Sequence, residues 1–104
     1  MSPQSLNLNG STQPEIFRQT VDDMVAALRA DASRFWRDSL QADGPLEIWE
    51  INGQRYLSNG NHRFQAALAI AAEIPDEMIV EPDMTGSGVL VFRFDQMTWL
   101  SGRK

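Results

Sequence analysis

The sequence predicts a small α/β (α+β) domain with N-terminal helices and a four-stranded mixed sheet that contains one β-α-β crossover. First, apolar residues recur at helical spacing between residues 21 and 36. Second, Asn52-Gly53 separates two β-prone runs, 46–51 and 54–57, which indicates a hairpin with a type I′ turn. Third, a strand at 54–58, an alanine-rich run and a β-prone run at 77–81 follow one another, and two strands so connected are expected to be parallel.

Length and composition limit the function classes. A chain of 104 residues with 42% hydrophobic content is expected to fold as one domain. The absence of cysteine excludes disulfides, thiolate catalysis and zinc bound through sulfur. With a single histidine, a metal would be held mainly by carboxylates, which favours Mg²⁺. The net charge of −5 argues against general coating of DNA.

The N-terminal part is expected to contain a flexible lead and two helices. Residues 1–12 are polar and aperiodic, so they are assigned to the lead, and the domain is assigned to residues 13–104. Capping residues allow a first helix from either about 14 or about 20 to 30, and a second helix, either separate from the first or continuous with it, is expected at about 32–40. Phe35 and Trp36 are expected in the core, although Trp36 could reach the rim of a pocket.

The C-terminal half is expected to hold the third helix and the remaining strands. A helix from 61 to about 73 should end before Pro75. After it we expect a strand at 77–81, a loop at 85–88, a strand at 89–94, a helical turn at 95–100 that closes the core with Trp99 and Leu100, and loose residues at 101–104. No apolar run approaches the roughly 20 residues that cross a bilayer, so no membrane partner is expected.

The stretch Asn59-Gly60-Asn61-His62-Arg63 is the candidate site. A strand that delivers a glycine into the first turn of a helix leaves backbone N–H groups unpaired, and the helix dipole then favours an anion. His62 can exchange a proton near neutral pH, and Arg63 is a permanent forked cation. The same residues are also explained by an ordinary turn with a partly buried histidine and a solvated arginine, which would have no binding function.

The sequence resembles the ParB/sulfiredoxin-like superfamily. The resemblance covers about residues 20–100 and is carried by the segments 44–48 and 52–63, by Ala66-Ala67 and by Ile74-Pro75. It implies a small α/β fold whose Gly-Asn-His-Arg loop binds phosphate, with Asn59, Gly60, Asn61, His62 and Arg63 as the phosphate-binding residues and His62 and Arg63 as the catalytic ones. Its members bind a nucleoside triphosphate such as ATP or CTP, or nucleic acid.

Two positions depart from the family pattern. Sulfiredoxins require a cysteine where this chain has Asn61, so reduction of sulfinic acids is excluded. Many members carry an acid where this chain has Asn59, so the base or metal ligand expected there is missing. The compact length resembles the toxin domains of large bacterial secreted proteins. Such a domain would reach the cytoplasm of a target cell with its parent chain and be neutralised by a cognate immunity protein; otherwise a cytoplasmic protein is expected.

Three functions follow from these observations. The first is a nuclease-type toxin that hydrolyses phosphodiesters of DNA or RNA, with His62 as acid or base, Arg63 stabilising the phosphate charge, and Glu47, Glu50 or Glu81 as candidate acids. The second is a module that binds or hydrolyses ATP or CTP. The third is a non-catalytic interaction module that retains the fold. The cofactor expected is Mg²⁺ or a nucleoside triphosphate.

Overall fold

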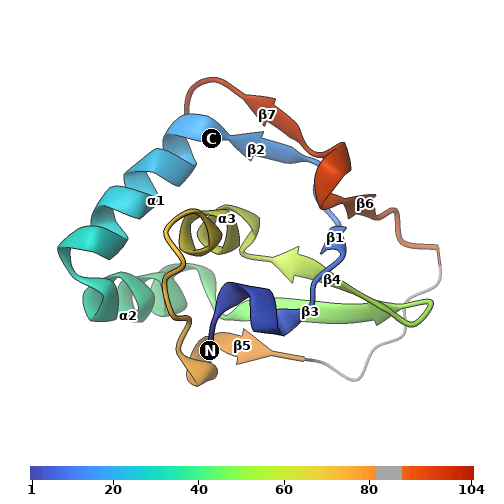
Figure 1. The fold of residues 1–104 in the computed structure, drawn as a ribbon, viewed down its shortest axis with the longest axis horizontal. Coiled ribbons are helices and arrows are strands. Elements are labelled where there is room, and N and C mark those ends of the chain that lie inside the picture. The colour runs from blue at the N-terminus through green and yellow to red at the C-terminus, as the bar shows by residue number, and fades with distance from the viewer. Residues whose placement is uncertain (82–87) are drawn as a thin grey trace.

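The computed structural model describes residues 1–81 and 88–104, which form a small α+β structure with a mixed sheet (Figure 1). Its helical elements are α1 (Arg18–Ala30), α2 (Ala32–Asp43) and α3 (Asn61–Ala69), with the short 3-10 turns η1 (Pro3–Leu6), η2 (Asp76–Met78) and η3 (Phe94–Gln96). Its strands are β1 (Gly10–Ser11), β2 (Glu15–Phe17), β3 (Leu46–Ile51), β4 (Gln54–Asn59), β5 (Ile79–Val80), β6 (Phe92–Arg93) and β7 (Thr98–Leu100). The larger sheet has the order β5-β3-β4-β1-β6, and β2 pairs with β7 in a second sheet.

The predicted hairpin is confirmed and forms the centre of the larger sheet. Strands β3 and β4 pair antiparallel with Ile51 opposite Gln54. The two turn residues, Asn52 and Gly53, have φ of 52° and 76°. Positive φ at both central positions is what a type I′ turn requires, and an Asn-Gly pair adopts it at low cost.

Helices α1 and α2 are separate because Asp31 interrupts the helical backbone between them. Asp31 is extended (φ −162°), and its side chain accepts a hydrogen bond from the Arg34 N–H at 3.1 Å, which caps the start of α2. Val21, Leu28 and Trp36 of the predicted apolar stripe are buried. The first helix begins at Arg18, close to the later of the two predicted starts, because residues 15–17 pair with β7 instead.

The predicted crossover is wrong in its strand direction. The chain runs from β4 through α3 to β5, and β5 does join the sheet, but β5 pairs parallel with β3. Since β3 is antiparallel to β4, strands β4 and β5 run in opposite directions with β3 between them. α3 ends at Ala69, earlier than predicted, and Ala71 adopts a positive φ of 51° in the turn that reverses the chain.

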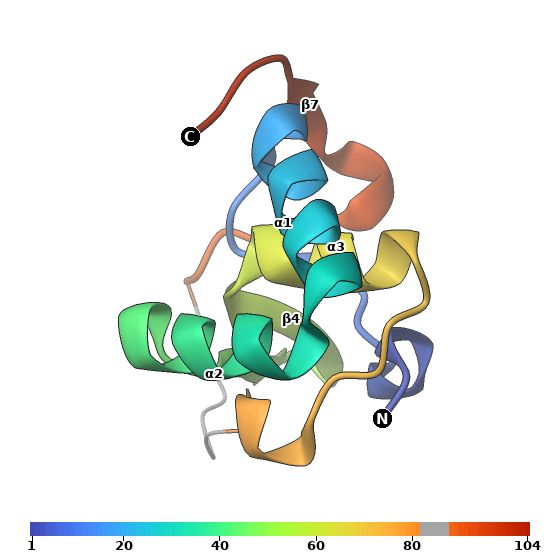
Figure 2. The ribbon, with the colours of Figure 1, turned by 90° about the vertical axis from the view of Figure 1, so that its left-hand side faces the viewer.

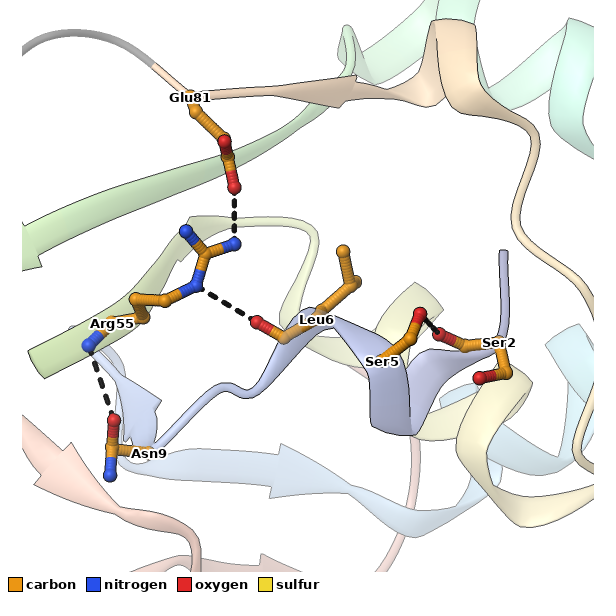
Figure 3. A network of polar contacts seen from close by, with 6 residues as sticks. All are labelled: Ser2, Ser5, Leu6, Asn9, Arg55 and Glu81. Carbon is orange, nitrogen blue, oxygen red and sulfur yellow. Dashed lines mark hydrogen bonds and ion pairs between the residues drawn. The ribbon is translucent and has the colours of Figure 1, made fainter.

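The first twelve residues differ from the predicted flexible lead, because they take part in the sheet. Gly10 and Ser11 form β1, which lies between β4 and β6. Arg55 of β4 fixes the segment around η1 to the sheet (Figure 3): its Nε donates to the Leu6 carbonyl at 2.9 Å, its backbone N–H donates to Asn9 Oδ1 at 3.2 Å, and its guanidinium pairs with Glu81. The polar composition of this segment gave no sign of such long-range pairing.

The C-terminal segment also differs from its prediction. The end of the strand predicted at 89–94 is β6 followed by η3, and the helical turn predicted at 95–100 is instead mainly strand β7, in which Trp99 is 41% exposed. Residues 101–104, predicted to be loose, contact α1: the Gln19 N–H donates to the Gly102 carbonyl and Arg103 pairs with Asp23. The loop predicted at 85–88 lies outside the described residues except for its last residue, and so does the end of the predicted strand at Pro82.

Helix α3 occupies the middle of the molecule. Figure 1 shows it between α1 and the larger sheet, and the view in Figure 2 shows α1 in front of α3 with α2 below. α1 packs directly on α3 and on α2. The core combines the inner face of the hairpin (Leu46, Ile48 and Leu57) with Phe64 and Ala67 of α3. In the described ranges, no helix is long and apolar enough to cross a membrane.

The position of β1 predicts a measurable role for Gly10. A Cβ at this position would overlap the carbonyl oxygen of Phe92 on the neighbouring strand β6. Gly10→Ala should therefore lower the free energy of unfolding by about 1–3 kcal/mol, as overpacking does, while Gln4→Ala at an exposed site of the same segment should change it by less than about 0.5 kcal/mol. Urea denaturation followed by circular dichroism measures both. Equal stability of the two variants would mean that the first residues are not part of the folded sheet.

Candidate functional site

The candidate site is built around Gly60, where β4 ends and α3 begins. Gly60 has φ of 94°, in the left-handed region that favours glycine. A Cβ here would overlap Leu46 Cδ2 and would lie 3.1 Å from Arg63 Nη2. Both the backbone conformation and the close approach of these side chains therefore require glycine at this position.

Asn59 and Arg63 hold the junction between α2 and β3. Asn59 Nδ2 donates to the carbonyl of Asp43 at 3.0 Å and to the carbonyl of Pro45 at 2.9 Å. Arg63 Nη1 donates to the carbonyl of Gly44, between them, at 2.7 Å. Three consecutive carbonyl groups at the C-terminal end of α2 are thus satisfied by two side chains of the loop, and a cation at this end also favours the helix dipole.

Asn61 and His62 hold the segment that leads into α1. Asn61 Nδ2 donates to the Gln13 carbonyl at 3.1 Å, and the Phe17 N–H donates to His62 Nε2 at 3.0 Å. His62 is only 7% exposed and stacks against the Phe17 ring. Because Nε2 accepts a hydrogen bond, it carries no proton, so the imidazole is neutral with its proton on Nδ1. Burial and, secondarily, the charge of Lys104 lower the pKa of His62.

Several backbone N–H groups of the loop make no hydrogen bond within the described residues. The first hydrogen bond of α3 runs from the Phe64 N–H to the Gly60 carbonyl at 2.9 Å. Within residues 1–81 and 88–104, the N–H groups of Asn61, His62 and Arg63 donate to no protein acceptor. The positive end of the helix dipole lies at the same three groups, so together they favour an anion.

A polar cavity of about 190 Å³ lies at this helix start. It is lined by all five residues of the loop 59–63 together with Gln13, Thr20, Met24, Asp43 and Lys104. The Lys104 N–H donates to Thr20 Oγ1 at 2.9 Å, which fixes the end of the described chain beside the cavity. A second hollow of about 260 Å³ shares Gln13, His62 and Lys104 with it, so His62 borders both.

Two of the cavity residues each have a buried side-chain atom with no hydrogen-bond partner in the part of the chain that the structure describes. These atoms are Arg63 Nη2, a donor, and Asn61 Oδ1, an acceptor. Arg63 is 3% exposed, and its pKa is lowered by burial, against which the nearby Asp43 carboxylate acts. An unpaired buried polar atom costs about 1–3 kcal/mol.

The five residues of the predicted loop all line the same cavity, but the sequence did not predict the other residues that line it. Gln13, Thr20, Asp43 and Lys104 reach the cavity from four other places in the chain, and no local pattern in the sequence marks them. Among the described residues that line the cavity, Asp43 has the one carboxylate side chain; Glu47, Glu50 and Glu81 do not line it. Over the described ranges, no group of three or more His, Cys, Asp or Glu side chains is placed to hold a metal ion.

Comparisons with protein-family models, with curated proteins and with solved structures find no match for this chain.

The buried state of His62 predicts how stability depends on pH. Because the folded-state pKa lies below the unfolded value of 6.5, the unfolded chain binds the proton more readily. The free energy of unfolding should therefore decrease as the pH is lowered from about 7.5 to about 5.5. His62→Gln supplies an oxygen acceptor for the Phe17 N–H but does not titrate, so its stability should change less over this range. Urea denaturation at several pH values tests this; parallel curves for the two proteins would contradict it.

Proposed function

We propose that this domain binds a phosphoryl group of a nucleotide in the cavity at the start of α3. One observation carries the proposal: the polar cavity is lined by Lys104 and by Asn61, His62 and Arg63, whose N–H groups donate to no acceptor within residues 1–81 and 88–104. Backbone N–H groups at a helix N-terminus bind phosphate well, and the positive charge of Lys104 at the same cavity favours an anion further.

The side chains and the main chain of the loop have different tasks in this proposal. The side chains of Asn59, Asn61, His62 and Arg63 hydrogen-bond to other segments of the backbone. They hold the loop in place, while its N–H groups and Lys104 meet the ligand. Because these donors are already held in place by the fold, binding of an anion requires little further loss of conformational entropy.

The dimensions of the cavity favour one phosphoryl group with the remainder of the molecule outside. A volume of about 190 Å³ is below the roughly 300–1,000 Å³ that encloses a whole small-molecule ligand. A terminal phosphate of a nucleotide can enter such a cavity from one side. The net charge of −5 further favours a nucleotide over duplex nucleic acid, whose binding relies on excess positive charge.

Removal of the Lys104 charge should weaken binding of phosphate-bearing probes. Lys104→Ala is expected to raise the dissociation constant for tripolyphosphate and for ATP about fivefold, equivalent to about 1 kcal/mol for one charge at a partly exposed site. Arg29→Ala removes the same charge from an exposed position of α1 outside the cavity and should leave both constants unchanged. Isothermal titration calorimetry measures these constants. Absence of binding of tripolyphosphate, ATP and CTP to the unmodified protein would refute the proposed function.

A second candidate, hydrolysis of phosphodiesters by a nuclease-type toxin domain, is favoured by the position of His62. Its imidazole borders both the cavity and the neighbouring hollow, so a phosphate in the cavity would lie beside a group that can transfer a proton. For this chemistry Nδ1 would have to act, since Nε2 is used by the Phe17 N–H. Delivery into a target cell and a cognate immunity protein belong to this candidate.

Nuclease activity can be tested with purified protein. Plasmid DNA and a folded RNA are incubated with and without Mg²⁺, using the unmodified protein, His62→Gln and Arg29→Ala. Loss of one proton-transfer group should lower the rate by about 10²–10⁴-fold in His62→Gln and leave Arg29→Ala unaffected. Intact substrates with the unmodified protein, or equal cleavage by the two variants, would exclude His62-dependent hydrolysis, and binding of tripolyphosphate would then remain as a separate result.

A further inference from the structure

A larger, apolar groove runs between α1 and α2 and does not contain the loop 59–63. Its volume is about 470 Å³, and its surface is mostly apolar, with Met24 and Ala27 of α1 on one side and Phe35 and Ala42 of α2 on the other. The alanines leave a slot between the helices, and Phe35 provides an aromatic wall that is only partly buried. A slot of this kind suits a flat apolar ring.

The groove and the polar cavity are neighbours. Met24 and Asp43 line both of them, so the two hollows lie on either side of these two residues. A single molecule can therefore place a charged group at the start of α3 and an apolar group between α1 and α2. The cavity alone is too small for a whole nucleotide, whereas the groove falls within the range of small-molecule sites.

We infer that the groove between α1 and α2 is the subsite for the base of the nucleotide whose phosphoryl group occupies the cavity; this inference rests on the proposed function. The base lies in the slot against Phe35 and Met24. Because every base offers a flat π-surface, stacking there adds affinity with little preference for one base.

Asp43 lies at the boundary of the two hollows, where the sugar would lie. Two other carboxylates at the groove are already engaged: Asp31 accepts the Arg34 N–H, and Asp38 pairs with the Arg34 side chain at 3.5 Å. In the described part of the chain, the Asp43 carboxylate accepts no hydrogen bond. A carboxylate in this position repels phosphate but accepts hydrogen bonds from the hydroxyl groups of a ribose. It thus favours a ribonucleotide placed with its sugar at Asp43.

The test compares phosphate alone with phosphate plus base. Isothermal titration calorimetry at one ionic strength is performed with tripolyphosphate, ATP and CTP. Both nucleotides are expected to bind at least about tenfold more tightly than tripolyphosphate, because only they occupy the groove.

Two matched substitutions on α1 locate the extra affinity. Ala27→Trp fills the groove, whereas Ala26→Trp places the same side chain on the neighbouring exposed residue outside the groove. Ala27→Trp should bring the affinity for ATP and CTP down to that for tripolyphosphate and leave tripolyphosphate binding unchanged. Ala26→Trp should behave as the unmodified protein does. Circular dichroism and the tripolyphosphate constant show that each variant is folded.

The possible results separate the inference from the function on which it rests. If tripolyphosphate binds but nucleotides bind no more tightly, or if Ala27→Trp binds nucleotides as the unmodified protein does, the groove is not the base subsite and phosphate binding still stands. If none of the three probes binds, the proposed function fails and the inference fails with it.

Discussion

The structure depends on the hydrogen bonds that the side chains of the loop 59–63 make to distant backbone groups. Asn59 and Arg63 hold the carbonyls of residues 43–45, Asn61 holds the carbonyl of Gln13, and His62 accepts the Phe17 N–H. Each bond joins segments between 14 and 48 residues apart in the chain. A single loop therefore fixes how the entry to α1, the exit from α2 and the start of α3 meet. These bonds stabilise the fold because burial removes water from the polar groups, which would be left without any hydrogen-bond partner if the bonds were absent.

Arg63 is the most demanding member of this set, since its guanidinium is almost fully buried. Burial of a charge is unfavourable unless polar groups compensate it. Here the compensation comes from the carbonyl of Gly44, from the negative end of the α2 dipole and from the nearby Asp43 carboxylate. Nη2 nevertheless has no hydrogen-bond partner among residues 1–81 and 88–104, and a Cβ at Gly60 would lie only 3.1 Å from it.

The sequence predicted those parts of the fold that local residue patterns determine. The β3–β4 hairpin follows from Asn52-Gly53, and the loop before α3 follows from a glycine between a strand and an alanine-rich run. Strand β1 could not be predicted, because two residues in a polar segment carry no periodicity and form a strand only by pairing with β4 and β6. The direction of β5 was missed for a similar reason: it depends on pairing with β3 and not on the helix that precedes it. Asp43 and Lys104 join the site through tertiary packing alone.

The hydrogen bonds of the loop side chains change the interpretation of His62 and Arg63 as phosphate ligands. In sequence, a histidine and an arginine after a glycine suggest two side chains that contact a phosphate. In the structure, His62 Nε2 and Arg63 Nη1 already bind protein backbone, whereas the N–H groups of residues 61–63 have no acceptor within residues 1–81 and 88–104. Main-chain donors bind a phosphate by position and not by residue identity. Substitutions of the loop side chains would thus change the geometry of the loop, whereas Ala27 of the α1–α2 groove lies on α1 and makes no hydrogen bond to the loop within the described ranges.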